Sequence, residues 1–411
     1  MHVELLYGRR GLKLELPDEI ETTVIRKHPM TPLHAPQAAV RNALAHPVDA
    51  PPLAGPARGG KSACILICDI TRPVPNGIIL PPLIDTLLAA GLDPARIRVL
   101  VATGLHRPNE GKELREIVGS DEVLSTVTVE NHFARDREAH ADLGITPGGV
   151  PIMIDRRFVE ADLKIVTGLV EPHFMAGYSG GRKVVAPGVA YQDTILMFHT
   201  AHVLEHPNAS NCVVEGNPLH QEQLEIVRAL GDVLAFGEIE SSHLLAVDFM
   251  RKHAEVKVPR KFKTVVTTSA GYPLDKTYYQ TVKGMVGVID ILEPGGDIII
   301  ASECSEGMGS REFVDAQRAL CRMGPDAFMA MLETREKALI DEWQTEMLVK
   351  ALRVGNVRLY ATGLAPEDLR DIYVEPISSV EEAVLASVEK HADPRIAVVP
   401  EGPYVIPLFQ A

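Results

Sequence analysis

ACILICDITRP, at residues 63–73, is an apolar run that ends in an aspartate, a threonine and an arginine. A short continuous apolar run bounded by polar residues is typical of a strand buried on both faces of a parallel sheet. The helical pattern of Ile78–Ala90 follows it, with Pro81 and Pro82 placed where a first helical turn tolerates proline. A buried strand followed by a helix is the repeating unit of an α/β fold, so we expect a strand at Ala63–Cys68 within such a unit.

The same alternation of strands and helices continues along most of the chain. It predicts an α/β protein of two Rossmann-like domains with mainly parallel sheets, residues 1–258 and 259–411, and an active-site cleft between them. The boundary is placed in the basic stretch HAEVKVPRKFK, residues 253–263. The other expected strands are Arg96–Ala102, Val127–Glu130, Leu163–Thr167, Thr264–Thr268, Asp297–Ala301, Asn356–Tyr360 and Ile396–Val399. The other expected helices are Glu110–Val118, Lys276–Leu292, Pro325–Glu333 and Glu336–Leu348.

Composition restricts the possible partners. The 411 residues carry a formal net charge of -14, which argues against nucleic acid as a partner because its phosphates require a basic surface. A local cluster of arginine and lysine can still bind a small anion. The five scattered cysteines indicate a reducing compartment, and no apolar run reaches the ~18–20 residues of a membrane span. We therefore expect a soluble, cytoplasmic protein.

Polar residues collect at the ends of three predicted strands. Asp69 and Arg72 follow the first strand, His106 follows the second, and Glu171 and His173 follow another. Ligands of open α/β sheets bind beyond the carboxyl ends of the strands, so these side chains are expected in one cleft. The alternatives are an Asx-turn with a surface arginine and histidines that are simply solvated. Two histidines at equivalent strand ends favour a functional site.

EPHFMAGYSGGRK, residues 171–183, combines a histidine, a glycine-rich turn and a lysine. It is not a P-loop, because Val184 stands where that motif places the Mg²⁺-binding Ser or Thr. Gly180 and Gly181 are compatible with a phosphate cradle or with a tight turn. Lys183 is either a surface lysine or an amine kept for covalent attachment or Schiff-base chemistry.

His199 and His202 are candidate metal ligands. Their i, i+3 spacing can place both on one helical face, although one of them can equally be exposed. Neither forms the HExxH pattern of zinc hydrolases, and a site of histidines alone would lack ligands.

Gln280 and Lys283 are three residues apart near the start of a predicted helix, hence on one face. They are placed to point across the cleft toward Arg72, where an arginine and a lysine together suit a small carboxylate. A solvated helix face is the alternative.

Taken in order, these motifs resemble those of the nickel-dependent lactate racemase family. The resemblance extends from Asp69 to about Gly309, over half the chain. It is carried by Asp69-Ile-Thr-Arg72-Pro73, Gly104-Leu-His106-Arg107, His173 with Ser179-Gly180-Gly181-Arg182-Lys183, His199, and Tyr279-Gln280 with Lys283.

The resemblance implies a nickel pincer nucleotide as cofactor. In this family a nicotinic-acid-derived mononucleotide binds nickel through two sulfurs and a ring carbon, and a thioamide tethers it to a lysine. Lys183 matches the tether and His199 matches the fourth ligand of the square-planar shell that Ni(II) favours. The other residues implied at the cofactor are Asp69, Ser179, Gly180 and Gly181.

The resemblance also implies a reaction, the inversion of the C2 centre of a 2-hydroxy acid. Hydride moves reversibly from C2 to the cofactor, while His106 and His173 act as opposed acid/bases at the hydroxyl. Imidazole, with a pKa near ~6.5, suits a group that must both take and return a proton. The residues implied for substrate binding are Arg72, Tyr279, Gln280 and Lys283.

The resemblance indicates the substrate and the partners only in general terms. Lactate is the default substrate, and the alternatives are a longer, sugar-derived 2-hydroxy acid or a non-catalytic protein that binds small anions. The cofactor-biosynthesis enzymes are expected partners for loading, and neither nucleic acid nor membrane is expected. Whether Tyr278 or Tyr279 faces the site is not evident from the sequence.

Overall fold

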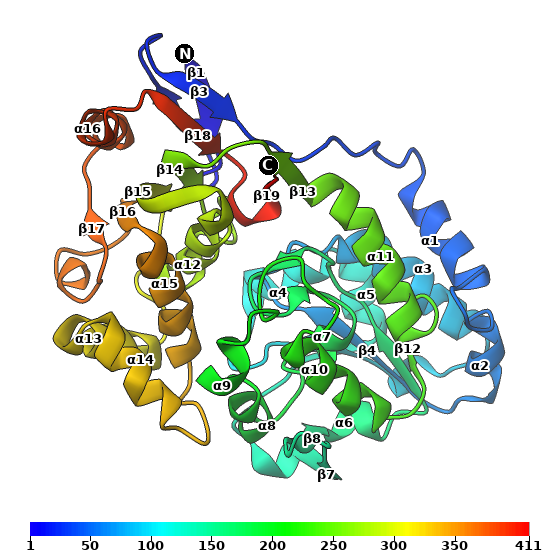
Figure 1. The fold of residues 1–411 in the computed structure, drawn as a ribbon. Coiled ribbons are helices and arrows are strands. Elements are labelled where there is room, and N and C mark those ends of the chain that lie inside the picture. Colours follow the sequence, from blue (N-terminus) through cyan, green and yellow to red (C-terminus); the bar gives the residue numbers. More distant parts are fainter. Residues whose placement is uncertain (411) are drawn as a thin grey trace.

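The computed structural model, which describes residues 1–410, contains two parallel β-sheets flanked by helices (Figure 1). This confirms the predicted α/β class. The first sheet has the strand order β12-β9-β4-β5-β6, with all neighbours parallel. Its strands are β4 (Ala63–Cys68), β5 (Ile97–Ala102), β6 (Thr128–Asn131), β9 (Leu163–Val166) and β12 (Val233–Leu234).

The second sheet has the strand order β17-β16-β15-β14-β18-β3, again all parallel. Its strands are β3 (Glu21–Val24), β14 (Phe262–Thr268), β15 (Leu292–Ala301), β16 (Asn356–Tyr360), β17 (Glu375–Pro376) and β18 (Arg395–Val399). Four two-stranded pairs complete the strands: β1 (His2–Leu5) with β2 (Leu12–Glu15), β7 (His140–Ile145) with β8 (Pro151–Asp155), β10 (Pro172–His173) with β11 (Gly177–Tyr178), and β13 (Glu255–Val258) with β19 (Ile406–Phe409).

The beginning of the chain lies with the second sheet, not with the first as expected from the range 1–258. β3 pairs with β18, and the hairpin of β1 and β2 packs beside it (Figure 1). Leu5 and Leu14 are fully buried in the core of this sheet, which explains the placement. We otherwise retain the division between residues 258 and 259 as a proposal.

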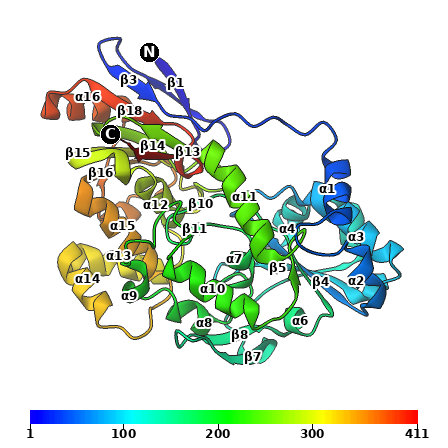
Figure 2. The same cartoon turned by 45° about the vertical axis from the view of Figure 1, so that its right-hand side comes forward.

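Helices surround both sheets, and Figure 2 shows α10 and α11 in front of the first one. Within residues 1–410 no helix combines the length and apolarity needed to cross a bilayer. The first group is α1 (Pro36–Ala45), α2 (Ala54–Gly59), α3 (Asn76–Ala89), α4 (Gly111–Val118), α5 (Asp121–Thr126), α6 (Arg156–Val159), α7 (Arg182–Val185), α8 (Gln192–Met197), α9 (Ala201–Leu204), α10 (Pro218–Arg228) and α11 (Ile239–Ala254). The second group is α12 (Tyr278–Val286), α13 (Arg311–Met323), α14 (Pro325–Glu333), α15 (Glu342–Val354) and α16 (Val380–His391).

β4 divides the first unit into two cores. All six of its residues are buried, because β5 and β9 lie on its two sides and helices cover both faces. Cys64 and Leu66 belong to one core, whereas Ile65 and Ile67 belong to the other, as the two-residue period of a strand requires. The carboxyl ends of β4, β5 and β9 therefore lie side by side, as predicted.

The bounds of α3 and α12 differ from those predicted. α3 begins at Asn76, so Pro81 and Pro82 lie inside the helix and not in its first turn. Pro81 and Pro82 have no backbone N–H, so the helix lacks two hydrogen bonds there. Burial of Leu80, Leu83 and Ile84 offsets this loss. The helix expected at Lys276–Leu292 is shorter, because Thr277 caps α12 and residues 292–296 belong to β15.

α15 begins at Glu342, six residues later than expected. Asp341 adopts a left-handed conformation with φ of 63°, which interrupts the helical pattern that starts at Glu336. The backbone N–H of Leu339 donates instead to the carboxylate of Glu342 at 2.6 Å.

The N-terminal hairpin offers a test of this architecture. Leu5→Ala should lower the free energy of unfolding by about 2–5 kcal/mol, because it leaves a cavity in the core of the second sheet. Leu6→Ala, at the neighbouring exposed position, should change it by no more than ~0.5 kcal/mol. Urea denaturation of both variants measures the difference, and equal effects would contradict the packing of this hairpin on the second sheet.

Candidate active site

One cavity of ≈ 900 Å³, measured to its open mouth, lies between the two sheets. Its walls come from the carboxyl ends of β4, β5 and β9, from the turn before α7, and from α12 and α15 of the second unit. Ion pairs cross the boundary near its mouth, between Arg107 and Glu306 and between Lys276 and Glu113. The residues selected from the sequence that line it are Asp69, Arg72, His106, His173, Ser179, Gly180, Lys183, His199, Tyr279, Gln280 and Lys283.

Gly181 and His202 lie outside this lining. Gly181 has φ of 50°, and a Cβ there would lie 2.9 Å from His243, so this glycine shapes the turn against α11. His202 is exposed on α9 and does not accompany His199, so the metal pair with i, i+3 spacing does not form. Gly180 lines the cavity, so it can still border a phosphate. A side chain at this position would collide with Val170.

His106 is held by Asp69. The imidazole Nδ1 donates to Asp69 Oδ2 at 2.6 Å, which leaves Nε2 as the free ring nitrogen. Burial alone would raise the pKa of the Asp69 carboxyl, but His106 and the hydroxyl of Thr71 together lower it to about 2. Asp69 is thus an ionised carboxylate that orients the imidazole of His106 through its Nδ1.

His173 is held in the opposite tautomer. Its Nδ1 accepts hydrogen bonds from the backbone N–H groups of Met175 and Ala176, each at 3.2 Å. The proton of the neutral ring is therefore on Nε2. Burial, followed by the charges of Lys183 and Arg72, moves the pKa of His173 well below its usual value. Of these two histidines, His106 has a free lone pair and His173 has a free N–H.

Arg72 is fixed by two protein contacts. Its Nε forms an ion pair with Glu171 Oε1 at 2.8 Å, and its NH1 donates to the carbonyl oxygen of Thr71 at 3.0 Å. The other carboxylate oxygen of Glu171 is buried without a protein partner. Glu171 was noted in the sequence, but its ion pair with Arg72 depends on the packing of two separate strand ends.

Two lysines face the same cavity as Arg72. Burial, then the charge of Arg72, lowers the pKa of Lys183 to about 7. Burial and Arg72 also place the pKa of Lys283 well below its usual value, although Glu171 opposes this shift. An amine that loses its proton near neutral pH is a competent nucleophile, so Lys183 suits covalent attachment.

His199 presents a free ring nitrogen. Its Nδ1 donates to the carbonyl oxygen of Ile195 at 2.8 Å, which leaves the Nε2 lone pair unused. Burial lowers the pKa of His199 to about 3, so the ring is neutral. A backbone carbonyl on one nitrogen and a free lone pair on the other is the usual state of a metal-ligating histidine. No group of three or more His, Cys, Asp or Glu side chains within residues 1–410 is arranged to hold a metal ion.

The wall formed by the second unit resolves the choice between the two tyrosines. Tyr279 lines the cavity and contacts the ring of His106 edge-on at 6.4 Å between centroids, whereas Tyr278 is fully buried in the core. Gln280 also lines the cavity, and its Oε1 is buried without a protein partner.

Among the lining residues that the second unit contributes, three were not selected from the sequence: Asp341, Trp343 and Gln344. The Trp343 ring stacks near that of His199 at 4.5 Å between centroids, and its Nε1 donates to the Tyr279 hydroxyl at 3.1 Å. The only feature of the sequence that pointed to Trp343 is that it is the single tryptophan of the chain. All three lie where a helix was expected, and the bend at Asp341 brings them to the cavity.

Comparison with protein families and sequences gives consistent matches. Residues 7–211 match the family described as the lactate racemase N-terminal domain, and residues 258–407 match the lactate racemase C-terminal domain. The chain is 31% identical to the lactate racemase of Thermoanaerobacterium thermosaccharolyticum, over 98% of this chain and 99% of that protein. It is 29% identical to the lactate racemase of Lactiplantibacillus plantarum, also over 98% of this chain and 99% of that protein.

Solved structures agree with these matches. The lactate racemase apoprotein from Thermoanaerobacterium thermosaccharolyticum is similar with a TM-score of 0.89 and 30% identity, over 99% of this chain and 100% of that chain. A Thermotoga maritima protein with 17% identity has a TM-score of 0.71 over 94% of this chain and 100% of that chain, which shows a common fold.

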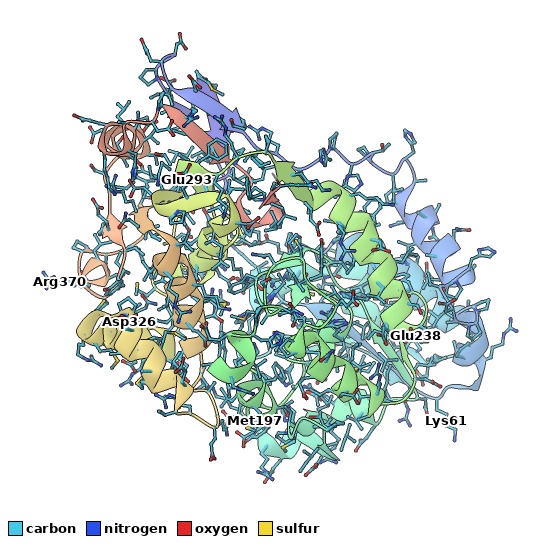
Figure 3. All side chains as sticks on the ribbon, viewed as in Figure 1. Lys61, Met197, Glu238, Glu293, Asp326 and Arg370 are labelled. Atoms are coloured by element: carbon cyan, nitrogen blue, oxygen red, sulfur yellow. The ribbon has the colours of Figure 1, made fainter. Side chains whose placement is uncertain are left out.

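The lowered pKa of Lys183 can be measured by amine reactivity. The rate of acylation of Lys183 should rise with pH, reach half of its maximum near pH 7, and level off at higher pH, where the amine is neutral. The exposed Lys61, labelled in Figure 3, is the matched comparison, since ordinary lysines titrate near ~10.4. Mass spectrometry of the modified peptides gives both rates. A Lys183 profile that parallels that of Lys61 would contradict the shift.

Proposed function

Because this chain belongs to the lactate racemase family, we propose that it inverts the C2 configuration of a small 2-hydroxy acid, with lactate as the reference substrate. The observation that carries the proposal is the pairing of His106 and His173 in one cavity with Arg72 and Lys283. The chemistry requires groups that move a hydroxyl proton and groups that bind a carboxylate.

Arg72 and Lys283 are the proposed carboxylate ligands. Glu171 and the Thr71 carbonyl already fix the Arg72 guanidinium, so its remaining N–H groups are pre-oriented for a planar carboxylate. A carboxylate that arrives beside Lys283 favours the protonated amine and offsets the effect of burial on its pKa. Binding of the substrate would therefore raise the pKa of Lys283 and favour its charged form.

His106 is the proposed base when the two rings have the protonation states described above. Its free Nε2 accepts the hydroxyl proton, and the carboxylate of Asp69 stabilises the imidazolium that forms. His173 starts with its proton on Nε2 and donates a hydrogen bond to the substrate oxygen. For the opposite enantiomer His173 must take up a proton, which requires its ring to release the backbone N–H groups of Met175 and Ala176. The two proposed acid/bases are thus chemically unlike.

We also propose a nickel pincer nucleotide as the cofactor. The buried amine of Lys183 and the free Nε2 of His199 face one cavity, and Gly180 lines the same cavity in the turn before α7. These observations fit a group with one covalent tether and one protein metal ligand. When bound, this group supplies a reversible acceptor for the C2 hydrogen as hydride. Ser179 contributes indirectly, because its hydroxyl donates to the Leu169 carbonyl at 2.6 Å and so fixes the turn.

Loading of the cofactor implies partner enzymes that make it, which we propose as transient partners. We also propose a cytoplasmic location, which the five free thiols support. A protein that only binds small anions would not need a nearly neutral lysine and two oriented histidines beside its anion site, so we favour an enzyme.

The proposal predicts specific losses of racemisation in the chain co-produced with the cofactor-making enzymes. His106→Ala and Asp69→Asn should each lower the rate of loss of optical purity of lactate by about 10²–10⁴-fold, because each removes the base or its orientation. His173→Ala should also abolish inversion. His202→Ala, which changes an exposed histidine on α9, should leave the rate unchanged. Chiral chromatography measures all four variants, and a fully active His106→Ala or His173→Ala enzyme would contradict the scheme.

Loading is measured on the same samples. Intact-mass spectrometry should show an adduct on Lys183, and metal analysis should show nickel in equal amount to the chain. The variants should carry the adduct as the unaltered chain does, since their changes leave Lys183 and His199 in place. An unmodified Lys183 without nickel would overturn the cofactor assignment.

A further inference from the structure

Asp341 is a carboxylate at the cavity wall that the proposed reaction does not use. The residue is 8% exposed and lies at the turn before α15, in a left-handed conformation that non-glycine residues rarely adopt. Aspartate at a helix start usually accepts a hydrogen bond from the helix backbone, but this side chain does not cap α15. Its carboxylate is turned toward the cavity instead. Strained backbone of this kind is found preferentially at functional sites.

The neighbours of Asp341 leave it able to accept a further hydrogen bond. The hydroxyl of Ser310 donates to Oδ2 of Asp341. The hydroxyl of Tyr279, which accepts from Trp343, lies beside the same carboxyl and is its second donor. Burial raises the pKa of Asp341, while Ser310 and His106 act in the opposite direction. A carboxylate offers about four acceptor positions, so these two contacts leave it able to accept a hydrogen bond from a ligand.

Gln280 contributes a polar atom on this wall that has no protein partner. Gln280 is nearly fully buried and lines the cavity, and its amide Oε1 accepts no hydrogen bond from the protein. The second unit thus presents both a carboxylate and an amide oxygen to the bound substrate. The methyl group of lactate can satisfy neither acceptor, and it would remove water from both.

From this wall we propose that Asp341 accepts a hydrogen bond from a hydroxyl on C3 of the substrate, so that the preferred substrates are 2,3-dihydroxy acids. The inference rests on the proposed function, because the same cavity must bind the 2-hydroxy acid. A cationic substituent would also suit a carboxylate, but the permanently charged Arg72 lines the same cavity and disfavours a further positive charge.

Glycerate and lactate differ only by the hydroxyl on C3 and therefore isolate the interaction. For the nickel-loaded chain, kcat/KM for glycerate should exceed that for lactate by at least ~10-fold and up to ~10⁴-fold, since a site built to bind a hydroxyl rejects an analogue without one. Asp341→Gly, which tolerates the left-handed backbone, should bring the ratio close to unity. Asp341→Asn keeps the shape and one acceptor and should give an intermediate ratio.

Asp326→Ala is the matched control. This aspartate is exposed at the start of α14, on the outside of the second unit (Figure 3), and its removal should leave the ratio unchanged. A wild-type enzyme that prefers lactate, or an Asp341→Gly variant that keeps the wild-type ratio, would overturn the assignment of Asp341 while leaving the proposed function intact.

If neither acid is inverted, a binding measurement distinguishes the proposed racemisation from the proposed role of Asp341. Calorimetric titration of the same loaded chain with glycerate and with lactate measures recognition without turnover. Tighter binding of glycerate that disappears in Asp341→Gly would support the role of Asp341 and overturn only the proposed racemisation. Equal binding of both acids, in the wild type, would overturn the role of Asp341.

Discussion

The ion pair between Arg72 and Glu171 is the interaction on which the rest of the cavity depends. It joins the loop after β4 to the loop after β9, and it keeps a permanent positive charge inside a largely buried space. Two lysines, Lys183 and Lys283, face the same cavity. Burial, and after it the charge of Arg72, lowers the pKa values of both, so the amine of Lys183 can lose its proton near neutral pH. The proposed substrate binding and cofactor attachment thus both depend on the surroundings of this one buried charge.

The two histidines differ for reasons that lie in their immediate backbone. His106 follows β5 and is oriented by a carboxylate, whereas His173 belongs to a tight turn whose N–H groups occupy its Nδ1. The proposed racemisation would require each ring to take and return a proton in alternate directions. In this structure only His106 can do so without rearrangement. The turn of residues 173–176 is therefore the part of the site expected to move during turnover in one direction.

The parts of the fold that could be predicted from sequence are those with a local cause. Ala63–Cys68 and Asn356–Tyr360 are continuous or alternating apolar runs, and the structure has strands at those residues. Asp69, Arg72, His106 and His173 could be placed in one cleft because they follow strands, whereas the roles of Lys183, His199 and Lys283 came from the family resemblance. Asp341 and Trp343 could not be found, because a single left-handed residue moves the start of α15 and turns this segment into the cavity. The partner of β3 lies some 370 residues away, and no local pattern predicts that pairing.

The central claim is that the hydrogen on C2 leaves and returns inside the cavity while the histidines handle only the hydroxyl proton. Inversion of a substrate that carries deuterium at C2, in ordinary water, tests this claim most directly. Mass spectrometry of the inverted product should show that the deuterium is retained, because hydride held in the cavity does not exchange with solvent. Loss of the deuterium to water at the rate of inversion would contradict the account, since it would indicate that a base removes the C2 hydrogen as a proton.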